Sequence, residues 1–114
     1  MRKSRYPRIE LNHDDLLWLA GLLEGEGCFT VMKVGRRRHP CVRIDMTDED
    51  VIARVSVLWK RKYTRVVPKR ASRKDTFVCK VTGYCAVELM KDLLPNIGLR
   101  RSSRIRGIIA GLAQ

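Results

Sequence analysis

An apolar run near the start of the chain, Leu16 to Leu23, is followed at once by two glutamates that each precede a glycine. Asn12, with Asp14 and Asp15 behind it, is typical of a helix start, and the helix is expected to reach about Glu24 and end at Gly25. Because the run is apolar all the way round, more than one side of this helix must be covered. The stretch therefore predicts a helix that packs against its own domain and against a second surface.

The acids and glycines of this stretch indicate what the second surface is. Glu24 and Glu26 follow the apolar run at the carboxyl end of the helix, where the macrodipole is already negative, so they disfavour folding and suggest a functional role. Gly21 and Gly25, four residues apart, would let another helix approach closely. We therefore expect a second copy of the chain to pack here with C2 symmetry. The alternative is a core helix buried in a monomer, which 114 residues supply little mass to wrap. The expected interface residues are Leu17, Ala20, Gly21, Glu24 and Gly25.

The rest of the chain alternates between strand-like and helix-like segments. Thr47 is expected to cap a helix, with Asp50 three residues on, and Gly35 to Arg38 to form a basic turn. The strands are expected at 28–34, 39–46, 64–69 and 76–82, and the later helices at 47–59, 84–94 and after Gly98. This order predicts an α+β domain over residues 12–114, with one four-stranded antiparallel sheet, helices on one face and the other face free. Residues 1–11 form a basic arm that carries Arg2, Lys3, Arg5 and Arg8.

Charge and cysteine content limit the classes of function. The 24 Lys and Arg against 12 acids give a net charge of +12 and a pI near 10.2. Such an excess favours a polyanionic partner, nucleic acid ahead of an anionic membrane surface, although a solvated basic surface is the simpler alternative. No run approaches the ~20 apolar residues of a membrane span, so a soluble intracellular protein is expected. Four cysteines without metal-binding spacing indicate reduced thiols, with two disulfides as the alternative.

The opening stretch, Leu19 to Gly27, resembles the signature of the LAGLIDADG homing endonucleases. Five of its nine positions match those letters, with Glu24 and Glu26 in place of the two aspartates, and the predicted element order matches the αββαββα core of that family. The resemblance implies a homodimeric, Mg²⁺-dependent endonuclease that cuts both strands of a long pseudo-palindromic DNA site. It implies that Glu26 is the metal ligand and catalytic residue, with Glu24 serving mainly helix-end structure.

Two further catalytic residues follow less directly from the resemblance. Asp48 comes just after the second strand, where relatives place a polar residue that positions water or metal; capping the next helix is an equally good interpretation. Arg100 falls where relatives carry a basic residue. An arginine cannot act as a general base, but it can orient water or offset phosphate charge.

The free face of the sheet is expected to enter the DNA major groove. Arg43 is the best candidate for a bidentate guanine contact, while basic loop residues are expected to contact phosphates. For each charged residue alone, simple solvent exposure is an equally good interpretation. The predicted DNA-binding residues are Thr30, Met32, Arg36, Arg37, Arg38, His39, Cys41, Arg43, Asp45, Arg65, Lys69, Arg70, Val78 and Lys80, with Arg73 and Lys74 beside the last loop.

Two other classes of function remain open from the sequence. One keeps the fold without cleavage, as an RNA-splicing maturase or a DNA-binding regulator. The other is a basic structural or ribosome-associated protein that packs RNA. The latter requires neither a dimer nor a preferred duplex sequence.

Overall fold

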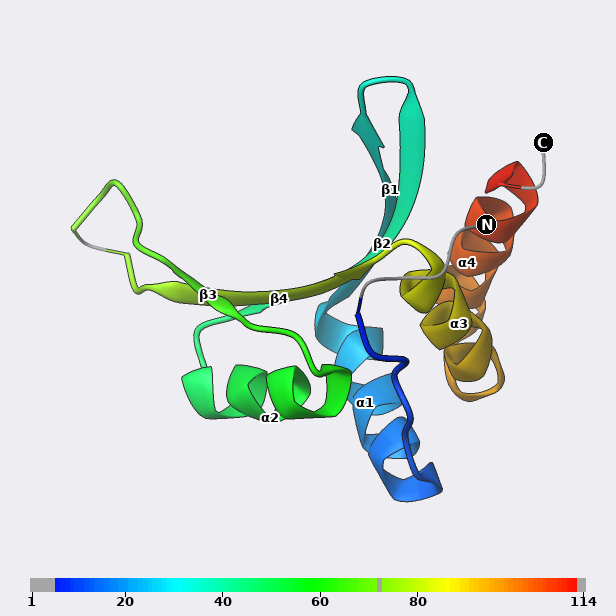
Figure 1. Ribbon diagram of the computed structural model, residues 1–114. Helices are drawn as coiled ribbons and strands as arrows, with labels where there is room; N and C mark the ends of the chain where they lie inside the picture. Colours follow the sequence, from blue (N-terminus) through cyan, green and yellow to red (C-terminus); the bar gives the residue numbers. More distant parts are fainter. Residues whose placement is uncertain (1–5, 72, 113–114) are drawn as a thin grey trace.

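The computed structural model describes residues 6–71 and 73–112, so Arg2, Lys3 and Arg5 of the basic arm lie outside it (Figure 1). Within these residues, helices alternate with pairs of strands, as the sequence predicts. The elements are α1 (His13–Glu26), β1 (Gly27–Val34), β2 (Arg37–Met46), α2 (Glu49–Trp59), β3 (Thr64–Val66), β4 (Thr76–Thr82), α3 (Tyr84–Leu93), the 3-10 helix η1 (Leu94–Asn96) and α4 (Leu99–Leu112).

The four strands form one antiparallel sheet in the order β1-β2-β4-β3. In Figure 1 the β1–β2 hairpin rises steeply while β3 and β4 extend sideways, and the helices lie to one side of this bent sheet. The predicted α+β fold, with one four-stranded antiparallel sheet and helices on one face, is confirmed. No helix among the described residues combines the length and apolar character that crossing a bilayer requires.

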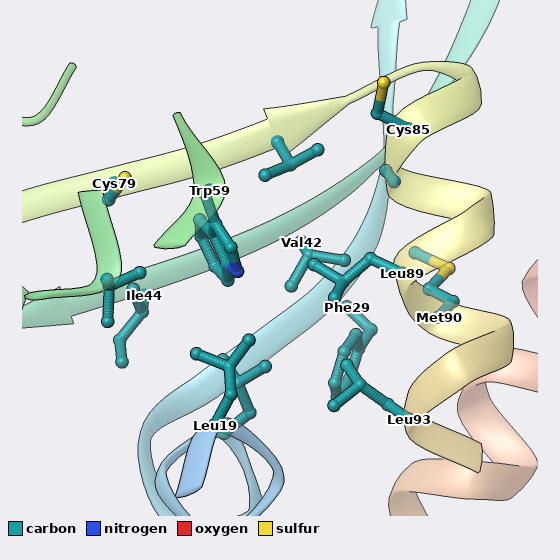
Figure 2. Packing of buried hydrophobic residues seen from close by; sticks show 14 of the residues in the cluster. Leu19, Phe29, Val42, Ile44, Trp59, Cys79, Cys85, Leu89, Met90 and Leu93 are labelled. Carbon is teal, nitrogen blue, oxygen red and sulfur yellow. The ribbon is translucent and has the colours of Figure 1, made fainter. Parts of the chain in front are cut away.

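The core lies between the helices and the covered face of the sheet (Figure 2). Leu19 and Leu23 of α1 lie in one buried cluster with Val42 and Ile44 of β2. Trp59, the last residue of α2, belongs to the same cluster. Burying one such side chain fully contributes roughly 1.5–3 kcal/mol. The covered side of α1 is therefore held firmly in its own domain.

The carboxyl end of α1 differs from the prediction. The helix does not end at Gly25 but continues through Glu26, and Gly27 is both its cap and the first residue of β1. The Gly27 N–H bonds to the Leu23 carbonyl, and a Cβ at Gly27 would lie 2.7 Å from Leu23 Cδ2. The chain thus passes from helix to strand without a loop, and only glycine fits at the junction.

Other boundaries were also predicted imperfectly. The first hairpin turn is only Gly35 and Arg36, because the positive φ of 62° at Gly35 suits a two-residue turn. Asp48, not Thr47, occupies the N-cap position of α2. The strand predicted to reach Lys69 stops at Val66, two residues before Pro68, which has no N–H for the ladder.

Candidate functional site

One side of α1 is open to solvent and nearly free of side-chain bulk. Leu17 is 43% exposed, and Gly21, Glu24 and Gly25 are exposed as well. A Cβ built at Gly21 or Gly25 would meet no atom within 4 Å among the described residues. Ala20 does not share this face: it is only 2% exposed and packs in the core with Leu19 and Leu23, so its assignment to the interface is wrong.

Glu24 connects the end of α1 to the start of α4. Its Oε1 accepts a hydrogen bond from the Gly98 N–H at 2.8 Å, one residue before α4 begins. Its Oε2 lies 3.5 Å from Nε of Arg101. A Cβ at Gly98 would lie against the Glu24 carboxylate, so any side chain there would displace this carboxylate from its hydrogen bond. Glu24 is therefore a structural acid that caps a neighbouring helix.

Glu26 has the opposite environment. It is exposed at the last position of α1, and it makes no hydrogen bond or ion pair with any described residue. No cluster of three or more His, Cys, Asp or Glu side chains that could hold a metal occurs in the part of the chain that the structure describes. Among the described residues, Glu26 is thus not part of a larger cluster of ligands, and it suits a hard cation only if other oxygen ligands come from outside the chain.

The two other catalytic candidates both follow Glu26 in the sequence and come from different helices, α2 and α4. Arg100 is exposed in the first turn of α4 and lines a groove beside Gly27 and Cys28, the residues that follow Glu26. Asp48 is exposed at the start of α2, and its side chain makes no capping hydrogen bond there. Capping, the alternative role for Asp48, is therefore not what its side chain does.

The uncovered face of the sheet carries a line of charged side chains. Arg43 lies opposite Lys80 in the β2–β4 register, and Asp45 lies two residues along β2. Arg43 Nε donates to Asp45 Oδ1 at 2.7 Å and Nη2 to Oδ2 at 3.0 Å. This two-point contact with Asp45 raises the pKa of the Arg43 guanidinium. The same face carries Thr30, Met32, Arg37 and His39.

Four of the predicted DNA-binding residues are placed differently. Cys41 is 1% exposed and Val78 is 8% exposed, so neither side chain is available to a partner. Cys41 is on the free face by alternation, but it is short and sits on a central strand between Thr30 and Thr82, and burial raises the pKa of its thiol. Arg65 pairs with Phe77 on the helix-covered face and binds Asp75.

Arg38 is the fourth predicted DNA-binding residue that the structure places differently. It pairs with Lys33 on the helix side, and its guanidinium lies 3.6 Å from where a Cβ at Gly111 of α4 would be. The remaining predicted cations are exposed outside the sheet. Arg36 is in the hairpin turn, and Lys69 and Arg70 line a shallow pocket with Arg73 in the loop between β3 and β4.

Sequence reasoning missed one cation of the free face. Lys62 lines a pocket with Arg43, Thr64 and Lys80. Extending the alternation of β3 two residues upstream from Thr64 would have found it. Arg61, its neighbour, is instead structural: it donates to the Trp59 carbonyl at 2.9 Å and lies 4.6 Å from the Tyr6 ring centroid.

No family model matches the sequence, and no curated protein matches it. Solved structures do match the fold. The homing endonuclease I-CvuI, in complex with the I-CreI target, aligns with a TM-score of 0.57 at 19% identity over 83% of this chain and 63% of its own. The archaeal intron-encoded homing endonuclease I-Vdi141I, complexed with DNA, gives 0.60 at 18% over 86% and 68%.

A third match, the LAGLIDADG homing endonuclease I-GzeII in complex with its DNA target, gives a TM-score of 0.59 at 15% identity over 91% of this chain and 37% of its own. The chain thus spans less than two thirds of I-CvuI and just over one third of I-GzeII. The architecture belongs to the α+β class in which helices cover one face of a single antiparallel sheet. More specifically, this chain has the LAGLIDADG homing endonuclease fold.

Proposed function

We propose that this protein is a homodimeric, Mg²⁺-dependent endonuclease that cuts both strands of a long pseudo-palindromic DNA site. The observation that carries the proposal is the position of Glu26. Its carboxylate has no partner among the described residues, lies at the end of a helix with an open glycine face, and directly precedes a sheet whose uncovered face is basic.

Dimerisation is part of this proposal because it would complete the metal site. When two copies pack α1 against α1, their Glu26 carboxylates approach each other, and two like charges so placed favour a divalent cation between them. Glu24 is occupied by Gly98 and Arg101, so it is not available for this role. The groups that would hold the metal are therefore Glu26, its symmetry mate and the phosphates of the substrate.

Each functional side chain has a chemical task in this proposal. When bound, Mg²⁺ would supply an activated water and would neutralise charge on the leaving oxygen. Glu26 would hold the cation through its carboxylate, and Arg100 would offset the negative charge that develops on the phosphate. Asp48, free of a capping bond, orients water through its carboxylate.

The free face of the sheet and the basic loops supply DNA affinity. Arg43, Lys62 and Lys80 face the same side, and Arg36, Arg70 and Arg73 extend beyond the strands. Such cations position the duplex through its phosphates, while side chains on the strands read base edges. The two identical faces of a dimer would require a near-palindromic site.

The test starts with selection of bound duplexes from a randomised palindromic library, followed by cleavage of the selected site with and without Mg²⁺. Glu26→Gln should lower the cleavage rate by at least about 100-fold without weakening DNA binding. Glu10→Gln, the same change at another exposed glutamate, should leave the rate unchanged. A Glu26→Gln protein that cuts as fast as the parent excludes this metal site.

Sedimentation at micromolar concentration tests the dimer separately. A persistent monomer would exclude the shared-helix arrangement. A dimer that binds a duplex selectively but never cuts it would favour the DNA-binding regulator over the nuclease.

A further inference from the structure

We propose that Arg101 is a positioning residue for Glu26, which holds the backbone that carries this carboxylate without touching the metal or DNA. The inference rests on the proposed metal role of Glu26. It concerns a residue that comes from the opposite end of the chain, in the first turn of α4.

The guanidinium of Arg101 donates hydrogen bonds to backbone carbonyls on both sides of Glu26. Its Nε donates to the Glu24 carbonyl at 2.7 Å, and Nη1 donates to the Gly27 carbonyl. Glu24 lies two residues before Glu26, and Gly27 lies one residue after it. One planar side chain therefore spans the short segment from which the Glu26 carboxylate projects.

Arg101 is also well fixed itself. Its side chain is 15% exposed, far less than the 45% of Glu24, whose Oε2 lies 3.5 Å from Arg101 Nε. A guanidinium with its donors in a rigid fork is suited to such a two-point contact, whereas a lysine amine is a single point on a flexible stem. The position thus requires arginine and not only a positive charge.

The end of α1 explains why a cation is needed there. The last carbonyls of a helix have no partner within it, and its carboxyl end is negative. The last turn of α1 contains no basic residue and carries two glutamates. Arg101 supplies donors and positive charge from α4, which stabilises the end of α1 beside an acid that has no partner among the described residues.

The same contact would also set the relation between the two proposed catalytic groups. Arg100 is the neighbour of Arg101 on α4, and Gly98 at the start of this helix is held by Glu24. Releasing Arg101 therefore loosens both the segment that carries Glu26 and the attachment of the helix that carries Arg100.

The test compares Arg101→Lys with Arg104→Lys. Arg104 is a matched control on the same helix: its Nε donates to the Phe29 carbonyl at 3.1 Å, a contact beyond the Glu26 segment. Two quantities are measured on the dimer bound to its selected duplex: the Mg²⁺ dependence of cleavage, and the binding of Tb³⁺ by luminescence as a hard-cation probe that needs no turnover. DNA affinity without metal and the thermal midpoint report general damage.

We expect Arg101→Lys to raise the Mg²⁺ concentration for half-maximal cleavage, and the Tb³⁺ dissociation constant, by about tenfold, as loss of an outer contact to a metal ligand does. DNA affinity should not change, and Arg104→Lys should leave both metal values at the parent level. Equal behaviour of the two variants, or a loss of rate with unchanged metal dependence, overturns the inference while the nuclease proposal stands. A parent protein that neither cuts nor binds Tb³⁺ at its duplex overturns both.

Discussion

Glu24 and Glu26 are two residues apart at the end of α1, yet their side chains have different energetic consequences. Glu24 accepts a backbone N–H and pairs with Arg101, whereas Glu26 has no partner among the described residues. An unpaired acid at a helix carboxyl end opposes the macrodipole. Removing the Glu24 carboxylate should therefore lower stability. Removing the Glu26 carboxylate should instead lower activity without lowering stability.

The first prediction concerns Glu26→Gln. Removing the charge should leave the folded state unharmed or raise the free energy of unfolding by about 0.3–1 kcal/mol, since the unfavourable dipole interaction disappears. Glu24→Ala should instead lower it by about 0.5–2 kcal/mol, because the Gly98 N–H loses its acceptor. Urea unfolding of both variants measures this. If Glu26→Gln is the more destabilised, the assignment of structural and functional acid is reversed.

The second prediction concerns the thiols. Cys28 is exposed, whereas Cys79 is buried, and burial raises the pKa of the Cys79 thiol to about 11. Because only the thiolate reacts, Cys79 should remain unmodified near neutral pH in the folded protein. Mass spectrometry after brief treatment with N-ethylmaleimide should find one fast site, which Cys28→Ser removes. Fast labelling that persists in Cys28→Ser would contradict the burial of Cys41, Cys79 and Cys85.

Among the secondary-structure elements, α1 has two different sides. Leu19 and Leu23 anchor one side in the core, while Gly21 and Gly25 leave the other side without bulk. Glycine inside a helix costs roughly 0.5–1 kcal/mol relative to a good helix former, so these residues weaken the isolated chain. Close packing against a second helix is the physical reason we infer for retaining them.

This view of α1 gives a third prediction, tested with Gly21→Gln and Gly107→Gln. Both glycines are exposed helix positions where a Cβ meets nothing within 4 Å among the described residues. In the parent, the unfolding midpoint should rise with protein concentration, as it does for a dimer. Gly21→Gln should abolish that dependence, while Gly107→Gln should keep it and add about 0.5–1 kcal/mol of stability. Identical concentration dependence in all three proteins would exclude the α1 interface.

Local chemistry made some of these elements predictable. Asn12 caps α1 as expected, its Oδ1 accepting the Asp15 N–H at 2.8 Å, because a cap is built from residues three apart. The bounds of β4 also match, since Phe77, Cys79 and Val81 recur at every second position and are buried on the core face, although Val78 on the other face is buried too. Glu24 and Glu26 were singled out for the same reason: their position on the helix is visible in the sequence.

Contacts between distant segments were not predictable. The end of α1 is decided by the strand that follows and by Arg101, 77 residues from its acceptor at Glu24. No local sequence pattern predicts a contact between residues so far apart. The burial of Cys41 likewise depends on neighbours from two other strands, Thr30 and Thr82, and not on the alternation within its own strand. Sequence periodicity assigns a residue to a face, but the neighbouring strands decide whether its side chain is accessible.

For the protein as a whole, the net charge of +12 is the dominant property. The cations occur both on the free face and in the loops that extend from it, so DNA affinity should fall steeply as salt rises. This is a collective effect, because each phosphate that is neutralised releases counterions.

The fourth prediction measures one of these contributions. Lys80→Gln should reduce the slope of log affinity against log salt by about 1, the value for one phosphate contact. Lys91→Gln, an exposed lysine on α3 away from the free face, should leave the slope unchanged. Fluorescence anisotropy of a labelled duplex at several salt concentrations gives both slopes. An unchanged slope in Lys80→Gln would remove this strand from the contact surface.

The junction at Gly27, where α1 becomes β1 without an intervening loop, has a consequence for engineering. In a pair of subunits joined along α1, the tilt between the two helices would be transmitted rigidly to the two sheets and would fix the number of base pairs between half-sites. Surface substitutions on the strands would leave that spacing alone. Inserting a single residue between Gly27 and Cys28 would turn every side chain of β1 to the opposite face. The side chains proposed to read DNA would then leave the free face, while Glu26 would keep its place at the end of α1.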